Sequence, residues 1–230
     1  MLTKKAIFRH LPLQVIAIFA LLLVSASPQA ENAPRDNLVI QPQPDGTSII
    51  SNATDGYQFV MSDGWHPVLL PPTEAELQEF RTVIEEYQLP IDETVLPPTE
   101  EDQDFYPLLL GLEMDPTHYA NGIFMNVFAM AEIHLFPGAG LIPLSTMAGI
   151  AQDAEGIEDA YIVHKNGKEV LVVSMAYDGI YAQLVIFVTN RKGVMFAFAT
   201  NTSEMHPLIT EEFNAILDTL EFAVEDAPVQ

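Results

Sequence analysis

Residues 159–222 read DAYIVHKNGKEVLVVSMAYDGIYAQLVIFVTNRKGVMFAFATNTSEMHPLITEEFNAILDTLEF, and the pattern that they continue begins at Ile157. Runs rich in β-branched and aromatic residues are separated by turn signals at Asn166-Gly167, Asp178-Gly179 and Lys192-Gly193. A segment of helical periodicity follows, from about Pro207 to Leu220, with proline near its start. The pattern predicts an antiparallel β-meander that ends in a helix.

The first residues have the composition of a secretory leader. Lys4, Lys5 and Arg9 precede a nearly unbroken apolar run from Val15 to Val24, and small residues follow up to Ala26. Ten apolar residues fall short of the roughly 20 that a membrane-spanning helix needs. We therefore expect residues 1–26 to be a signal peptide cleaved after Ala26, which leaves a soluble mature chain in the periplasm or outside the cell.

Composition limits what the mature chain can be. With 49% hydrophobic residues, the 230-residue chain can bury a core, and the absence of cysteine excludes disulfides and thiolate chemistry. Removal of the leader leaves six basic residues against 32 acidic ones, a net charge of −26. Such a surface repels nucleic acid and anionic lipid headgroups. Cationic surfaces, divalent ions or simply a saline medium fit this charge, and a saline medium would require no function of it.

The domain is expected to span residues 56–223, between a flexible N-terminal leader at 27–55 and a C-terminal tail at 224–230. This flexible segment, which follows the signal peptide, is rich in proline, asparagine and glutamine and can add an edge strand. A strand is predicted around Tyr57 to Met61, followed by a helical and acidic insert at 71–107. Thr73 and Glu76 have the spacing of a capping box at the start of its amphipathic helix.

Two further elements lie between the insert and the meander. Residues 123–136, IFMNVFAMAEIHLF, predict one long strand that is apolar on most of both faces. A short helix is expected after it, because Leu144, Met147, Ala148 and Ala151 recur at helical spacing. With helices on both sides of the sheet, we expect Phe196 and Phe198 on one face to be as buried as Met195 and Ala197 on the other.

The order of these motifs resembles the PsbP-like family, which includes extrinsic proteins of photosystem II, the Ran-binding Mog proteins and bacterial envelope proteins similar to the DcrB lipoproteins. The resemblance covers Tyr57 to Phe222. It rests on Tyr57-Gln58-Phe59, Asp63-Gly64-Trp65, Gly167, residues 170–177, 183–188 and 193–200, Phe213, Ile216-Leu217 and Leu220-Glu221-Phe222. It implies an α+β fold in which an antiparallel sheet lies between helices, an α/β/α sandwich, and a role in binding or supporting other proteins. Ser62 replaces the family's proline, and the insert is longer than the family requires.

Several single residues could act as metal ligands, nucleophiles or glycosylation sites, but each also has a simpler structural interpretation. Five histidines follow the leader, His66, His118, His134, His164 and His206, and none is spaced to share a metal on one helix. Glu132 and His134 could form half a metal site, although a polar strand end is the simpler interpretation. Ser62 and Ser174 lack a nucleophile-elbow pattern. Trp65 reads as a core residue, and Asn52 and Asn201 match the glycosylation acceptor triplet.

Acidic residues gather in the insert but do not form a known calcium motif. Asp92, Glu93, Glu100, Glu101, Asp102 and Asp104 lack the glycine and the terminal glutamate of an EF-hand loop. The sequence predicts a solvated loop whose binding of cations is weak and unselective at best. No catalytic, cofactor-binding or metal-ligating residue is assigned. An exported, non-catalytic protein that binds or supports an envelope protein is the favoured hypothesis, and an extracytoplasmic hydrolase with a cleft between sheet and insert is the alternative.

Overall fold

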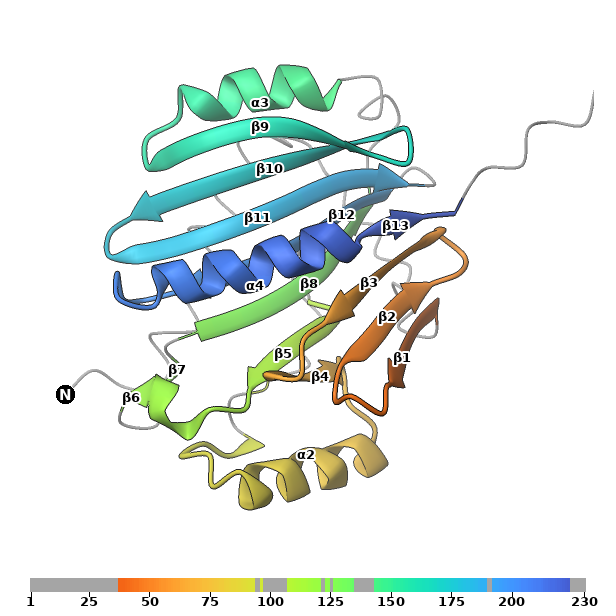
Figure 1. Ribbon diagram of the computed structural model, residues 1–230, viewed down its shortest axis with the longest axis vertical. Coiled ribbons are helices and arrows are strands. Elements are labelled where there is room, and N and C mark those ends of the chain that lie inside the picture. Colours follow the sequence, from red (N-terminus) through yellow and green to blue (C-terminus); the bar gives the residue numbers. More distant parts are fainter. Residues whose placement is uncertain are drawn as a thin grey trace, which may run out of the picture.

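The computed structural model describes residues 37–93, 96, 107–120, 123–124, 126–134, 143–189 and 192–223. Its main element is a seven-stranded antiparallel sheet with the order β4-β5-β8-β12-β11-β10-β9 (Figure 1). The predicted meander supplies four of these strands, and earlier parts of the chain supply the other three. Their bounds are β4 Trp65–Leu69, β5 Leu109–Glu113, β8 Asn126–His134, β9 Ile157–Lys165, β10 Lys168–Tyr177, β11 Ile180–Thr189 and β12 Lys192–Thr200. The chain therefore has the expected α+β fold.

Two of the three predicted turns are where the sequence places them. Asn166 and Gly167 have φ angles of 49° and 80°, and Asp178 and Gly179 have 51° and 79°. Two consecutive left-handed residues are what a tight hairpin between twisted strands requires. The third prediction is wrong. Lys192 pairs with Thr189 and Gly193 with Val188, so the Lys192-Gly193 dipeptide lies inside the β11–β12 ladder.

A second sheet contains the strands nearest to both ends of the domain. Its order is β1-β2-β3-β13, with β1 at Leu38–Pro42, β2 at Ser48–Asn52, β3 at Tyr57–Met61 and β13 at Glu221–Phe222. Residues 38–52 were expected to belong to a flexible leader, and the structure corrects this. Leu38 is 4% exposed and Ile50 is fully buried, because alternate residues of these short strands face the core. The possible edge strand is present as β1.

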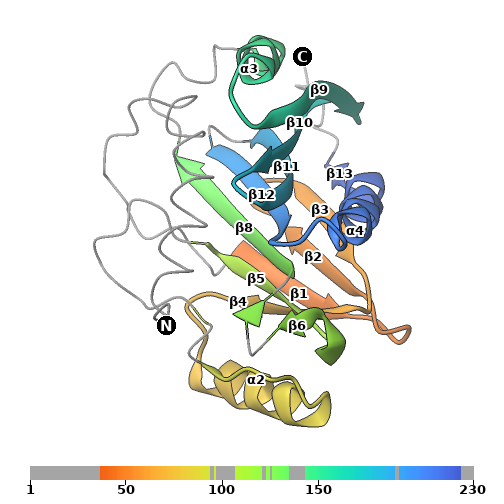
Figure 2. The ribbon, with the colours of Figure 1, turned by 90° about the vertical axis from the view of Figure 1, so that its left-hand side faces the viewer.

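Helices cover both faces of the large sheet, as predicted. Helix α4 (His206–Thr219) shares one face with the small sheet, and their apolar residues form a single cluster with Phe128, Phe196 and Phe198. On the other face, α3 (Leu144–Gln152) packs over β9 and β10, and α2 (Glu74–Glu86) packs over β4 and β5. Figure 2 shows α2 and α3 at opposite ends of the molecule, with α4 to one side of the sheet.

The central strand residues are buried on both faces, which confirms the prediction for β12. Phe196 and Phe198 are fully buried, Met195 on the opposite face is 4% exposed, and Ala197 is partly buried. Trp65 is a core residue, also as expected, with its ring 5.1 Å from that of Phe198. A two-sided apolar sheet of this kind cannot exist without cover on each face.

The strand predicted for residues 123–136 is divided. Ile123–Phe124 form β7, which pairs with β6 (Tyr119–Ala120) in a separate two-stranded sheet, and β8 begins at Asn126. Within β8, Phe128 and Met130 join the α4 side of the core, whereas Val127 and Ala129 pack toward α2. This is the expected alternation.

The insert helix α2 begins with the predicted capping box. The backbone N–H of Glu76 donates to the Thr73 hydroxyl, and the Glu76 carboxylate accepts from the Thr73 N–H at 2.6 Å. The helix buries less surface than its periodicity suggests. Phe80 alone is fully buried, Val83 and Ile84 are partly buried, and Tyr87 is 44% exposed. The helix lies at the rim of the sheet, where β4 and β5 are only five residues long.

Candidate functional site

A buried carboxylate at the end of β5 is the centre of a polar cluster. Glu113 is 5% exposed and ends its strand. Its two carboxylate oxygens are bound by different elements: Oε1 lies 2.6 Å from Nδ1 of His118, and Oε2 accepts a 2.8 Å hydrogen bond from the amide of Asn126 on β8. When Glu113 is ionised, the His118 ring donates from Nδ1; when it is protonated, the carboxyl donates to that nitrogen.

The short segment after β5 turns His118 back toward Glu113. Asp115 accepts hydrogen bonds from the N–H and hydroxyl of Thr117, which begins the 3₁₀ helix η3 (Pro116–His118). Proline at the first position of that helix suits the turn. The next residue, Tyr119, donates its hydroxyl to the backbone carbonyl of Glu113 at 2.5 Å. One turn therefore supplies two groups that fix the end of β5.

Burial controls the protonation of this cluster. It raises the pKa of Glu113 above its usual range, although hydrogen bonds from His118 and Asn126 act in the opposite direction. Hydrogen bonds from Thr117 lower the pKa of Asp115. Among the described residues, Oδ1 of Asn126 is buried without a hydrogen-bond partner. The arrangement can hold a proton on Glu113, and the described residues contain no group of three side chains suited to a metal ion.

We expect Glu113 to make the protein less stable as the pH rises. The folded protein keeps the Glu113 proton to a higher pH than the unfolded chain, whose glutamate has a pKa of about 4.3. The contribution is therefore complete below that value and is lost as the pH rises through the folded-state pKa. The free energy of unfolding in urea, measured between pH 4 and 7, should fall more steeply in the wild type than in Glu113→Gln. Parallel curves for the two proteins would contradict this.

A second polar cluster lies beneath the N-terminal end of α4. Ser174 on β10 donates its hydroxyl to Oε1 of Gln183 on β11 at 2.6 Å. The Gln183 amide nitrogen lies 3.3 Å from Nε2 of His206 and 3.5 Å from the Thr210 hydroxyl, both on α4. His206 therefore accepts in the tautomer that carries its hydrogen on Nδ1. Gln183 separates Ser174 from the imidazole, so the geometry is that of a structural bridge and not of a serine–histidine pair.

The remaining residues singled out from the sequence are dispersed. Ser62 donates to Glu212 on α4 at 2.7 Å. His66 is partly buried, and burial lowers its pKa although Glu79 lies near. His164 is exposed on β9. Asn52 is 1% exposed and hydrogen-bonded to Asp55, which does not suit a glycan acceptor, whereas Asn201 is exposed.

Part of the acidic insert and of the histidine set lies outside the described residues. This applies to Glu100, Glu101, Asp102 and Asp104, and to the side chains of Glu132 and His134. Glu93 is described, and it forms a two-point contact with Arg81 on α2, with N–O distances of 2.8 and 2.6 Å. Weak cation binding by the complete loop therefore stays a prediction.

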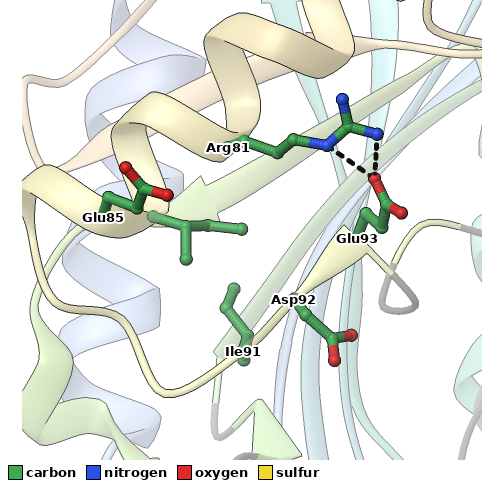
Figure 3. Close-up of a pocket in the computed structure, with 6 residues that line it drawn as sticks. Arg81, Glu85, Ile91, Asp92 and Glu93 are labelled. Carbon is green, nitrogen blue, oxygen red and sulfur yellow. Dashed lines mark hydrogen bonds and ion pairs between the residues drawn. The ribbon is translucent and has the colours of Figure 1, made fainter.

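A shallow cavity of about 320 Å³ lies beside this ion pair (Figure 3). Arg81, Ile84 and Glu85 come from α2, and Ile91, Asp92 and Glu93 come from the segment that follows it. The cavity is thus within the insert and not between insert and sheet, where the alternative hypothesis placed a cleft. Arg81, the one basic group among the described residues that line it, forms an ion pair with Glu93, and Glu74 lies 3.6 Å from it.

Sequence reasoning missed the Glu113 cluster because its members are unremarkable one by one. The signal that could have found it is the run from Glu113 to His118, in which Asp115 and Pro116 begin a turn directly after an apolar strand. Such a turn brings a histidine five positions onward back to the strand end. The sequence could not have indicated Asn126, because no local pattern specifies that β5 pairs with β8 or in which register.

Comparison with known proteins gives structural neighbours only. No family model matches the chain, and no curated protein matches it. The solution structure of cyanobacterial PsbP (CyanoP) from Synechocystis sp. PCC 6803 aligns with 78% of this chain and 94% of its own, at 10% identity and a TM-score of 0.45. LpqN of Mycobacterium tuberculosis, described as involved in cell envelope biogenesis, aligns with 83% of this chain and 94% of its own, at 11% identity and a TM-score of 0.35.

These similarities extend along most of each neighbour, but they are too distant to transfer a function. The first of these neighbours carries the name of the PsbP-like family that the sequence motifs resemble. Within the part of the chain that the structure describes, no helix is both long and apolar enough to cross a membrane.

Proposed function

We propose that this chain is an exported, non-catalytic protein that binds or supports another protein of the cell envelope. The observation that carries the proposal is that the polar side chains with possible reactivity are hydrogen-bonded to other parts of the fold. Ser62 is bound to Glu212, Ser174 to Gln183, and Glu113 to His118 and Asn126. Each pair joins two segments of the fold, so these groups position structural elements and hold one another.

The leader sequence and the charge support the same proposal. Lys4, Lys5, Arg9 and the apolar run up to Val24 are typical of an exported chain. The net charge of −26 after removal of the leader favours a partner with a cationic surface, because complementary charge accelerates and orients association. Large apolar side chains are exposed at several places on the described surface, namely Val39, Tyr87, Ile150, Tyr161 and Tyr177.

The test places a photoreactive amino acid at each of these five exposed positions in turn. The full chain is expressed in its own host, irradiated in intact cells, and recovered from the envelope fraction. We expect an adduct of one defined mass at neighbouring positions and not at all five, together with an N-terminus at Ser27. No adduct at any position, or a chain that stays in the cytoplasm, would overturn the proposal.

A parallel assay distinguishes the enzyme alternative. Purified mature protein is screened against ester, peptide and glycoside substrates, with Ser174→Ala and Glu113→Gln as comparison variants. We expect the same background rate from all three proteins. Turnover that either substitution abolishes, while the unfolding midpoint of the variant stays near that of the wild type, would replace the proposed function by a hydrolase.

A further inference from the structure

The large sheet ends on one side in a long strand that contains no proline. Outer strands expose unpaired backbone groups, and proteins commonly shorten them or place proline in them. The other outer strands follow this rule: β4 has five residues and contains Pro67, and β1 has five residues and ends in Pro42. Strand β9 has nine residues, IEDAYIVHK, and no proline. It is the exception among the described edges.

The hydrogen bonds of β9 show which backbone groups point away from the sheet. In an antiparallel ladder, successive residues alternate between bonding the partner strand and facing outward. The side chain of Gln152 on α3 donates to the carbonyl of Ala160 at 2.7 Å, so Ala160 faces outward. By alternation, Ile162 and His164 also face outward, because the register with β10 is unbroken from Asp159 to Lys165.

Protection of this edge is therefore partial. Gln152 covers the outward carbonyl nearest the start of the strand, where a register shift already interrupts the pairing with β10. From Ile162 to His164, no hydrogen bond from another described segment covers the outward groups. This leaves a short open edge beside α3, which lies along β9 in Figure 1.

Side chains on either side of the edge offer contact surface. Tyr161 pairs with Val172 and so lies on the α4 side of the sheet, with 40% of its surface exposed. Helix α3, on the other side, exposes 55% of Ile150. The side chains of an added strand would alternate between these two sides.

Charge selects the occupant. Asp153, Glu155, Glu158 and Asp159 are exposed at the start of β9 or just before it. The single basic residue of the strand, Lys165, lies 3.7 Å from Asp218 on α4 and is thereby balanced. A second copy of this chain carries the same large negative net charge and is disfavoured, whereas a lysine-rich extended segment would pair with these acids.

We propose that β9 accepts an extended, basic segment of a partner protein, which pairs with Ile162 and His164 as an additional strand. This inference rests on the proposed function and names the surface through which the chain would bind its partner. The backbone of the segment supplies the hydrogen bonds, and its basic side chains face the acids at the start of β9.

The first experiment measures binding of the mature protein to a nine-residue peptide of alternating lysine and valine. The matching peptide of glutamate and valine is the charge control. We expect the lysine peptide to bind and to slow hydrogen exchange at the amides of Ile162 and His164, and the glutamate peptide not to bind. Failure of the lysine peptide to bind, or binding without protection of those amides, would overturn the inference.

Matched variants separate backbone pairing from side-chain contact. His164→Pro removes an outward N–H without removing a bond to β10, whereas His164→Ala removes only the side chain. We expect about tenfold weaker peptide binding in the proline variant and little change in the alanine variant. The joint substitution Glu158→Lys and Asp159→Lys, which leaves residue 164 untouched, should also weaken binding. Equal binding by wild type, His164→Pro and the double lysine variant would contradict strand addition.

The two proposals can fail separately. If an envelope protein is cross-linked in cells equally well by wild type and His164→Pro, the chain binds a partner through another surface and the edge inference is wrong. If the lysine peptide binds as expected but no cellular adduct forms, β9 can accept an added strand and the proposed envelope function is wrong. A dimer of wild type that His164→Pro dissociates in sedimentation experiments would assign the edge to a second copy and overturn the basic-segment inference.

Discussion

Replacing Phe198 by alanine should lower the free energy of unfolding by about 3–5 kcal/mol. The side chain is fully buried on the α4 face of β12, with ring centroids 5.1 Å from Trp65 and 4.8 Å from Phe128. Its neighbours come from β4 and β8, which are fixed in the sheet. They cannot close the space left by the missing ring, so the lost contacts and the cavity both add to the cost.

Urea unfolding followed by circular dichroism measures this change. Ile150→Ala is the matched control, because Ile150 is also a large apolar residue but is 55% exposed, and its loss should cost less than about 0.5 kcal/mol. A cost below about 1 kcal/mol for Phe198→Ala would show that the cover over this face is absent in solution.

Gly111→Ala should destabilise the protein by about 1–3 kcal/mol, although it adds a single methyl group. A Cβ at residue 111 would lie 2.8 Å from Cβ and 3.0 Å from Cδ1 of Phe128, and 3.1 Å from Cε3 of Trp65. Phe128 cannot yield easily, because it is fully buried and its ring packs against those of Phe59, Phe196 and Phe198. The methyl group therefore forces β5 and β8 apart or moves the aromatic cluster.

Gly149→Ala is the control for this substitution. Gly149 lies on α3 with no atom within 4 Å of an added Cβ, so alanine there should stabilise the protein by about 0.5–1 kcal/mol through helix propensity. Opposite signs for the two glycine-to-alanine changes in the same urea assay are the expected result. A Gly111→Ala protein as stable as the wild type would mean that β5 packs less closely against Phe128 and Trp65 than described.

Local signals account for the parts of the fold that the sequence predicted correctly. The turns at Asn166 and Asp178 need left-handed backbone that few residues adopt, so asparagine or aspartate followed by glycine is specific. The capping box at Thr73 and the apolar spacing of α3 and α4 are equally local. These features depend on neighbours within a few residues along the chain.

Long-range pairing accounts for what was missed. Strand β2 has the required alternation, but its five residues are stable only because β1 and β3 flank them and the large sheet lies beneath. The cluster around Glu113 likewise needs Asn126 from a strand whose register no local pattern specifies. Periodicity in the sequence predicts which residues face the core. A polar site such as the Glu113 cluster depends on which strand ends lie together, and periodicity does not predict this.

Closure of the small sheet has a consequence for the order in which the chain can fold. Val60 on β3 donates to the hydroxyl of Thr219 in the last turn of α4, 159 positions later, and Tyr57 pairs with Phe222. Strand β3 therefore lacks its neighbour β13 until almost the whole chain has been synthesised. Contacts of such sequence separation form late and slow the folding reaction. A ribosome-bound chain that ends before α4 should remain sensitive to protease in its N-terminal strands, and release of the finished polypeptide should protect them.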